Sequence, residues 1–131
     1  MKSHVAAAPE RLLIFDVGSE KAAQLRQICE RLGVQLRELS GGQMYDTVGS
    51  LADSPGNTAA ALTPAEGGKE CIIFSGFSEK RLDEALKNIR ENIPGGIRLK
   101  AVVTPHNRKM TLGQLINELE REHEALKGKS R

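Results

Sequence analysis

The sequence repeats itself, and this constrains the fold more than any other feature. Three segments of the first half recur in the same order in the second: LIFDVGSEK at 13–21 as IIFSGFSEK at 72–80, VQLREL at 34–39 as IRLKAV at 97–102, and TVGSL at 47–51 as TLGQL at 111–115. The offsets between the copies are 59, 63 and 64 residues. Such self-similarity indicates a duplicated structural unit. We expect two half-repeats, 11–52 and 70–127, each ordered strand, helix, strand, helix.

Local signals predict the helices of these halves. Ser19 and Ser78 each follow an apolar run and precede a charged stretch, as N-cap residues do. Thr111, with Gln114 three residues later, forms a capping-box pattern at the start of the last helix. Apolar residues then recur with helical spacing after each of these starts. The helix after the second strand, at 43–52, is expected to be short.

Burial patterns predict the sheet. Residues 12–17, as far as Asp16, and residues 71–74 are apolar on both faces, whereas 34–37 and 97–103 alternate apolar and polar residues. Runs that are apolar on both faces are typical of central strands. The first and third strands are therefore expected in the middle of a four-stranded sheet. The favoured fold is α+β with the ferredoxin-like order 4-1-3-2 and extra helices, because the segment after the second strand is short for a crossover helix. The alternative is an α/β fold with a parallel sheet of order 2-1-3-4.

Composition limits the class of protein. The chain has 131 residues, the size of one domain. We expect a flexible tail at 1–10, a single domain at 11–131, and a flexible linker at 53–69 that joins the half-repeats. The net charge of +2 does not favour a nucleic-acid binder, and no apolar run is long enough to span a membrane. The two cysteines and the lack of a secretory signal predict a protein of the reducing cytoplasm.

The best candidate site is a basic loop before the last helix. No acidic residue occurs between Glu91 and Glu118, yet the loop TPHNRKMT at 104–111 carries several basic residues. A helix N-terminus offers free backbone N–H groups and a favourable dipole to an anion. The sequence therefore predicts a small anionic ligand, a phosphate or carboxylate group, at His106, Arg108, Lys109 and Thr111.

No cofactor or metal site is predicted. Glu120 and His123 have the spacing seen in di-iron bundles, but one such pair cannot complete that site, so His123 is expected to pack along the helix with its ring nitrogen near a carboxylate. Cys29 and Cys71 are interpreted as small core residues, because no histidine motif lies near either. Asp16 is interpreted as a turn residue.

Two aromatic residues allow a different function. Phe15 and Phe74 occupy matching positions on the predicted central strands, where RNA-recognition sheets carry stacking aromatics. The basic-Gly-aromatic run of those sheets is missing, so core packing is the favoured interpretation. Exposure of the two rings would distinguish the alternatives.

The second half resembles a known family. Its characteristic strings are GFSEKRLDEAL at 76–86, LKAVVTPHN at 99–107 and MTLGQLINELEREHEAL at 110–126. In these strings the sequence is similar to the domain of unknown function 3783, a family of small bacterial proteins. His106 stands where that family more often has threonine. Because the family carries no established activity, the resemblance implies no catalytic residues.

These observations lead to one preferred function and two alternatives. We expect a non-enzymatic interaction or regulatory module that binds a protein partner or a small anion. Glu118 with Glu122, and Glu120 with Glu124, form like-charge pairs that weaken an isolated helix. A homodimer through the C-terminal helix would offset this repulsion if Arg98 and Lys100 of a neighbouring subunit faced the acidic residues. An RNA-binding ferredoxin-like domain and a small enzyme remain as alternatives.

Overall fold

The computed structural model describes residues 9–53 and 69–129. Two 3-10 turns, η1 and η2, accompany the four strands and four helices. In chain order the elements are β1 (Arg11–Phe15), α1 (Ser19–Leu32), β2 (Gln35–Leu39), η1 (Gly41–Gln43), α2 (Val48–Asp53), β3 (Cys71–Ser75), α3 (Glu79–Asn92), β4 (Leu99–Val102), η2 (Asn107–Lys109) and α4 (Leu112–Lys129). The predicted tail, 1–10, and linker, 53–69, lie largely outside the described residues.

The sheet is mixed and its strand order is β2-β1-β3-β4. β1 pairs in parallel with β2, β3 pairs in parallel with β4, and β1 and β3 run antiparallel at the centre. The fold is therefore α+β with central β1 and β3, as predicted, but the favoured ferredoxin-like order 4-1-3-2 is wrong. The alternative has the observed order, but its all-parallel sheet is also wrong.

The register removes the argument on which the favoured order rested. Phe15, at the end of β1, pairs with Leu39 at the end of β2 and with Cys71 at the start of β3. The chain therefore leaves β2 and enters β3 at the same end of the sheet, so no crossover helix is needed between them. The shortness of the segment after β2, on which the ferredoxin-like order rested, does not distinguish the two arrangements.

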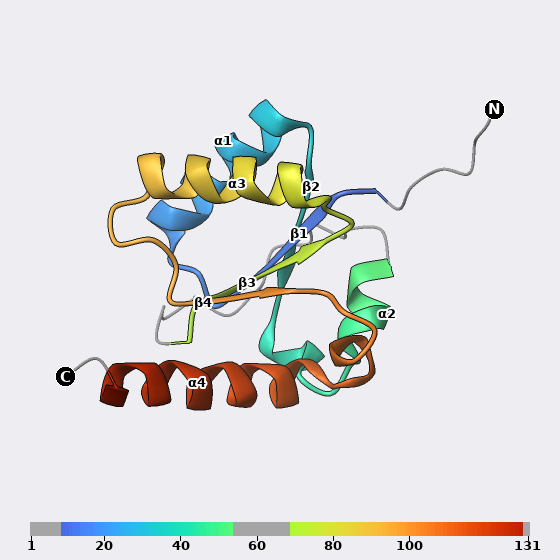
Figure 1. Ribbon diagram of the computed structural model, residues 1–131. Coiled ribbons are helices and arrows are strands. Elements are labelled where there is room, and N and C mark those ends of the chain that lie inside the picture. Colours follow the sequence, from blue (N-terminus) through green and yellow to red (C-terminus); the bar gives the residue numbers. More distant parts are fainter. Residues whose placement is uncertain (1–8, 54–68, 130–131) are drawn as a thin grey trace.

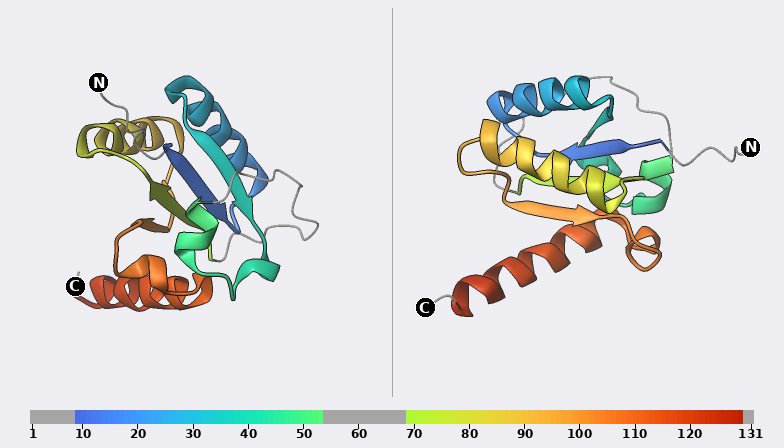
Figure 2. Two further views of the ribbon diagram at one scale, coloured as in Figure 1. Left: turned by 90° about the vertical axis from the view of Figure 1, so that its right-hand side faces the viewer. Right: turned by 45° about the horizontal axis from the view of Figure 1, so that its top comes forward.

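Helices cover both faces of the sheet. Figures 1 and 2 show α1 and α3 on one face and α2 and α4 on the other. Each face has its own hydrophobic core: Leu12, Ile14, Ile72 and Phe74 belong to the core under α1 and α3, while Leu13 and Ile73 belong to the core under α2 and α4. The central strands are apolar on both sides because each side chain contacts one of these two helical layers.

The two halves have the same order of elements. Residues that occupy equivalent places in the two halves are separated by a slightly different number of positions from the first sequence match. An offset of 59 matches Leu13 with Ile72, but these side chains face opposite layers. An offset of 60 matches Asp16 (φ 57°) with Gly76 (φ 82°), which occupy the same left-handed position between strand and helix. Aspartate is one of the few non-glycine residues that adopts this conformation readily. Duplication as the origin of the halves stays a prediction.

Two of the three helix starts predicted from N-cap residues are confirmed. Ser78 is the N-cap of α3 and accepts a hydrogen bond from Arg81 N at 3.2 Å. Thr111 N donates to Gln114 Oε1 at 2.9 Å and Gln114 N donates to Thr111 Oγ1 at 3.1 Å, which is the predicted capping box. At α1, however, Gly18 is the N-cap and Ser19 is already the first helical residue.

Candidate interaction surface

The loop from 104 to 111 is ordered by its own hydrogen bonds. Asn107 Oδ1 accepts from Thr104 N at 2.8 Å, and Asn107 Nδ2 donates to Val102 O at 2.9 Å. Asn107 was not a predicted site residue, although a short polar side chain inside a turn of this kind is a common way to fix a loop. Its side chain fastens the loop to the end of β4.

The backbone donors at the start of α4 are already used. Leu112 N donates to Asp46 O at 2.9 Å and Gly113 N donates to Met44 O at 3.0 Å, so both contact the segment before α2. Gln114 N is bound by the hydroxyl of Thr111. These are the N–H groups that the predicted anion would need, so an anion at this helix end would have to rely on side chains alone.

The predicted anion ligands also face different neighbours. Arg108 donates to the carboxylate of Asp53 at the end of α2. His106 is exposed and lies instead at the rim of a hollow against α4, and Lys109 is exposed. Binding of an anion at His106, Arg108, Lys109 and Thr111 therefore stays a prediction, without a common centre formed by the four side chains.

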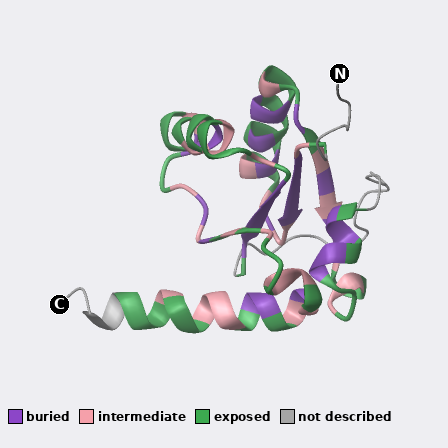
Figure 3. Cartoon of the chain, turned by 45° about the vertical axis from the view of Figure 1, so that its right-hand side comes forward, coloured by how far each residue is buried: buried purple, intermediate pink, exposed green. Residues whose placement is uncertain are grey.

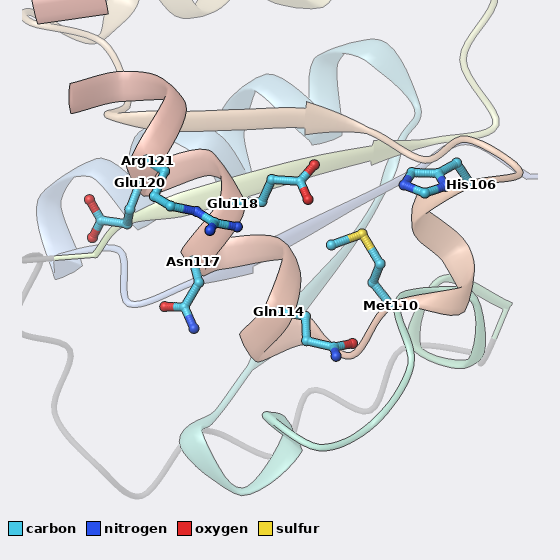
Figure 4. A pocket seen from close by; sticks show the side chains of 7 residues that line it. All are labelled: His106, Met110, Gln114, Asn117, Glu118, Glu120 and Arg121. Atoms are coloured by element: carbon cyan, nitrogen blue, oxygen red, sulfur yellow. The ribbon is translucent and has the colours of Figure 1, made fainter. Parts of the chain in front are cut away.

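The hollow beside His106 has a volume of about 660 Å³ and is open to solvent. Figure 4 shows its side chains: His106 and Met110 come from the loop, and the others project from α4. Its lining residues are His106, Met110, Gln114, Asn117, Glu118, Glu120 and Arg121. The lining carries an imidazole, two carboxylates and a guanidinium, so it offers charges of both signs to a ligand or partner.

Most of α4 lies outside the core. Its buried side chains, Leu112, Leu115 and Ile116, all occur in the first two turns, and no side chain between Asn117 and Leu126 is buried. Figure 3 shows this change along the helix. The side chain of Leu126 is 65% exposed.

Arg98 holds the exposed half of α4 against the sheet. Its guanidinium donates to the carboxylate of Glu120 and, at 3.4 Å, to Glu124 Oε2. Arg98 was expected to meet these acidic residues from a neighbouring subunit; the structure places it in the same chain. The contact offsets the repulsion between Glu120 and Glu124 without a partner.

A second hollow lies between α4 and the outer strand. It has a volume of about 410 Å³ and its lining mixes apolar groups with charges of both signs. The lining residues are Gly95, Ile97, Arg98, Leu99, Lys100, Leu119, Glu122, His123 and Leu126. We call this surface the β4 groove. His123 lies in it half-buried, and among the described residues no hydrogen bond or ion pair of its ring occurs, so the expected contact with a carboxylate is not formed.

The remaining sequence candidates have structural roles. Cys29 and Cys71 are buried free thiols, and burial raises the pKa of Cys29 to about 11 and that of Cys71 to about 12. Asp16 Oδ2 accepts a hydrogen bond from Lys69 N at 2.9 Å, so it closes the turn onto the start of the second half. Within residues 9–53 and 69–129, no group of three or more His, Cys, Asp or Glu side chains is placed to hold a metal ion.

The two phenylalanines are not presented on a common face. Phe74 is buried against α1 and α3, where its ring meets that of Phe77 edge to face at 5.3 Å. Phe15 is half-buried in the opposite core. Because helices cover both faces of the sheet, neither ring forms the open stacking platform of an RNA-recognition sheet.

Sequence reasoning missed two buried cations. Arg11 and Arg37 are buried beneath the C-terminal end of α2, although Arg37 belongs to a strand whose alternation predicted a solvent-facing side chain. No local signal distinguishes a buried arginine from an exposed one in an alternating strand.

Comparison with known proteins gives one match. Residues 70–126, which include β3, α3, β4 and most of α4, match the family model described as a domain of unknown function, DUF3783. No curated protein and no solved structure matches the chain. In the described part of the chain, the helices are too short or too polar to cross a membrane.

Proposed function

We propose that the protein is a non-enzymatic interaction module that acts through the α4 and β4 surfaces of residues 70–126, the segment that matches the DUF3783 family model. Its partner is a second copy of the chain, bound at the β4 groove. The free thiols of Cys29 and Cys71 support a location in the reducing cytoplasm.

One observation carries the proposal: α4 continues for ten residues after Ile116, its last buried residue, up to Leu126. This half of the helix adds little to the core, because Leu119 is its only apolar side chain that packs against the buried cluster. An ion pair from Arg98 nevertheless keeps it beside the sheet. A helix held in place with an exposed apolar residue is typical of a surface that meets a partner.

The outer strand supports a second copy as the occupant. β4 is an edge strand, so one side of its backbone has no neighbouring strand within the sheet. Its side chain of Val102 is 39% exposed. An open edge is a template for pairing with another strand, and a twofold axis brings the same edge of two copies together.

The charges of the β4 groove support the same partner. Lys100 and Glu122 carry opposite charges, both are exposed, and neither takes part in an ion pair among the described residues. A surface that meets its own copy across a twofold axis must be self-complementary. Lys100 of one copy would then meet Glu122 of the other.

A charge-swap cycle on the full chain tests this proposal. Sedimentation equilibrium over a range of concentrations should show a monomer–dimer equilibrium for the wild type. Lys100→Glu or Glu122→Lys alone should weaken the dimer at least fivefold, whereas the double variant should regain most of the affinity. Salt should weaken the wild-type dimer, because exposed charge pairs are screened.

Tyr45→Ser provides a matched control for nonspecific association. Tyr45 is 89% exposed and lies before α2, beside the start of α4, and it is not among the residues that line the β4 groove. Leu126→Gln should weaken the dimer and Tyr45→Ser should not. A chain that stays monomeric at several hundred micromolar, or a double charge-swap variant that regains no affinity, contradicts the proposal.

A further inference from the structure

Arg11 and Arg37 lie next to each other on neighbouring strands beneath α2. Leu13 pairs with Arg37 across β1 and β2, and Arg11 lies two residues before Leu13 on the same strand, so all three side chains face the α2 layer. The two arginines are only 7% and 9% exposed.

The hydrogen-bond partners of both guanidinium groups are neutral. Arg11 Nε donates to Gln35 Oε1 at 2.9 Å, and its terminal nitrogen donates to the carbonyl of Ala52. Arg37 donates to Leu51 O at 2.9 Å. No ion pair among the described residues includes either arginine.

One donor in this cluster has no acceptor. Arg37 Nε is buried and makes no hydrogen bond. Buried N–H groups are almost always bonded, and buried charges are almost always paired, because water is no longer present to solvate them. A buried cationic N–H without a protein acceptor is therefore a donor that a bound oxygen would satisfy.

The end of α2 cannot supply the missing negative charge. The C-terminal carbonyls of a helix carry about half a unit of negative charge in total, and α2 has only six residues. Asp53, the last residue of α2, is paired with a third arginine, Arg108. Of the three arginines at this helix end, only Arg108 is paired with a carboxylate among the described residues.

We propose that Arg11 and Arg37 form a binding site for a small oxyanion, a phosphate or carboxylate group, which accepts a hydrogen bond from Arg37 Nε. The planar fork of arginine matches the oxygens of such groups. Access requires an outward shift of the last turn of α2. The site lies on β1 and β2, away from the β4 groove, and it goes beyond the proposed docking function.

Arginine side-chain NMR on the full chain tests the proposal directly. The Nε–Hε resonances of Arg11 and Arg37 are followed during titration with sodium phosphate, and separately with sodium acetate, against sodium chloride at matched ionic strength. Arg37 should shift saturably with phosphate or acetate and not with chloride. Arg26, whose exposed guanidinium pairs with Glu38 at 2.6 Å, is the internal control and should not shift. Thermal stability is not the readout, because phosphate stabilises folded proteins in general.

A pair of substitutions sharpens the result. Arg37→Lys keeps the charge but removes Nε, and it should weaken phosphate binding at least tenfold, measured on the Arg11 resonance. Arg26→Lys should leave binding unchanged. If Arg37→Lys does not fold, the wild-type titration decides alone. An Arg37 resonance that responds equally to chloride, or saturable shifts confined to the amides of 106–112, overturns the proposal; the second result would place the anion at the basic loop instead.

Discussion

Thr47 and Thr111 face each other as an isolated antiparallel bridge, and each begins the turn that leads into a helix. The Thr47 hydroxyl accepts from Ser50 N at 3.2 Å, and the Thr111 hydroxyl accepts from Gln114 N at 3.1 Å. The hydrogen bonds around the bridge are reciprocal: Val48 N donates to Met110 O at 2.8 Å, and Leu112 N donates to Asp46 O at 2.9 Å. The starts of α2 and α4 therefore stabilise each other, and neither is complete without the other half of the chain.

Because α2 packs closely on Arg108 near this bridge, we expect Gly49 to be sensitive to substitution. A Cβ atom at Gly49 would lie 3.0 Å from Arg108 Cβ and from the backbone oxygen of Arg108. Gly49→Ala should therefore lower the free energy of unfolding by about 1–3 kcal/mol, measured by urea denaturation.

Gly113→Ala is the graded control for that substitution. Its Cβ would meet Met44 O at 3.3 Å, which is a milder contact. Alanine also gains about 1 kcal/mol over glycine within a helix, so this variant should stay within about 1 kcal/mol of the wild type. Equal stability of both variants would contradict the close packing of Gly49 on Arg108.

The contacts of Arg98 predict local rather than global destabilisation. Arg98→Gln should remove the part-buried ion pair with Glu120 and the more exposed one with Glu124, and surface ion pairs contribute about 0.2–1 kcal/mol each. Amide hydrogen exchange should accelerate in the second half of α4, while the amides of β1 and β3 keep their protection. Arg26→Gln, which removes a similar exposed ion pair with Glu38, should leave α4 unchanged. Unaltered exchange in α4 would show that Arg98 does not hold the helix.

Burial of the thiols predicts that they resist chemical labelling. Since the pKa values of Cys29 and Cys71 are raised to about 11 and about 12, both are protonated in the folded protein at pH 8. A thiol-specific disulfide reagent should react with neither thiol in buffer at pH 8 and with both in denaturant. Because the unfolded thiols ionise near pH 9 and the folded ones do not, stability should also fall as the pH rises above 9. Rapid labelling of the native protein would contradict the burial of these residues.

The contact between Glu10 and Arg81 predicts a loss of stability in acid. Arg81 donates to both oxygens of Glu10 at 2.8 Å, and this hydrogen bonding lowers the pKa of Glu10 from its usual 4.5. A carboxyl with a lowered pKa in the folded state stabilises the protein above its unfolded pKa, and this contribution disappears as the pH falls through the folded pKa. The free energy of unfolding should therefore fall below pH 4.5, and Glu10→Gln should reduce that dependence.

Glu84→Gln is the control for the acid prediction. Glu84 also pairs with Arg81, at 3.0 Å, but its side chain is 48% exposed and lies on the same helix. This variant should keep the acid dependence of the wild type. A Glu10→Gln variant with the wild-type pH profile would show that the pair does not couple protonation to folding.

Local patterns predicted the elements but not their contacts. The capping box at Thr111 and the N-cap at Ser78 were predicted correctly, because the donor and acceptor lie within three residues of each other. Leu13 and Ile73 were correctly assigned to central strands, because a strand that is apolar on both faces must be covered on both. The face of each side chain was harder: the sequence matched Leu13 with Ile72, and a shift by one residue turns a strand side chain to the opposite layer.

The candidate site was only partly predictable. His106 and Arg108 are two residues apart in the loop, yet one lines a hollow on α4 and the other pairs with Asp53. Which group a charged side chain contacts depends on elements that are distant in sequence. The composition of the loop does not indicate which elements these are. Arg98 shows the same limit, because it was expected to meet the acidic residues of α4 across a subunit boundary and instead pairs with Glu120 and Glu124 of its own chain.

The amino-acid sequence by itself indicated the order of strands and helices, the starts of α3 and α4, which two strands are central, and the family model that the second half matches. These features depend on residues separated by two to four positions, where periodicity and capping act. Only the tertiary structure decided that β1 and β3 run antiparallel, that Arg11 and Arg37 are buried without a carboxylate, and that Arg98 turns to α4. Each of these depends on contacts between residues far apart in the chain, and several pairings of the same strands bury comparable apolar surface, so packing of the whole chain selects among them.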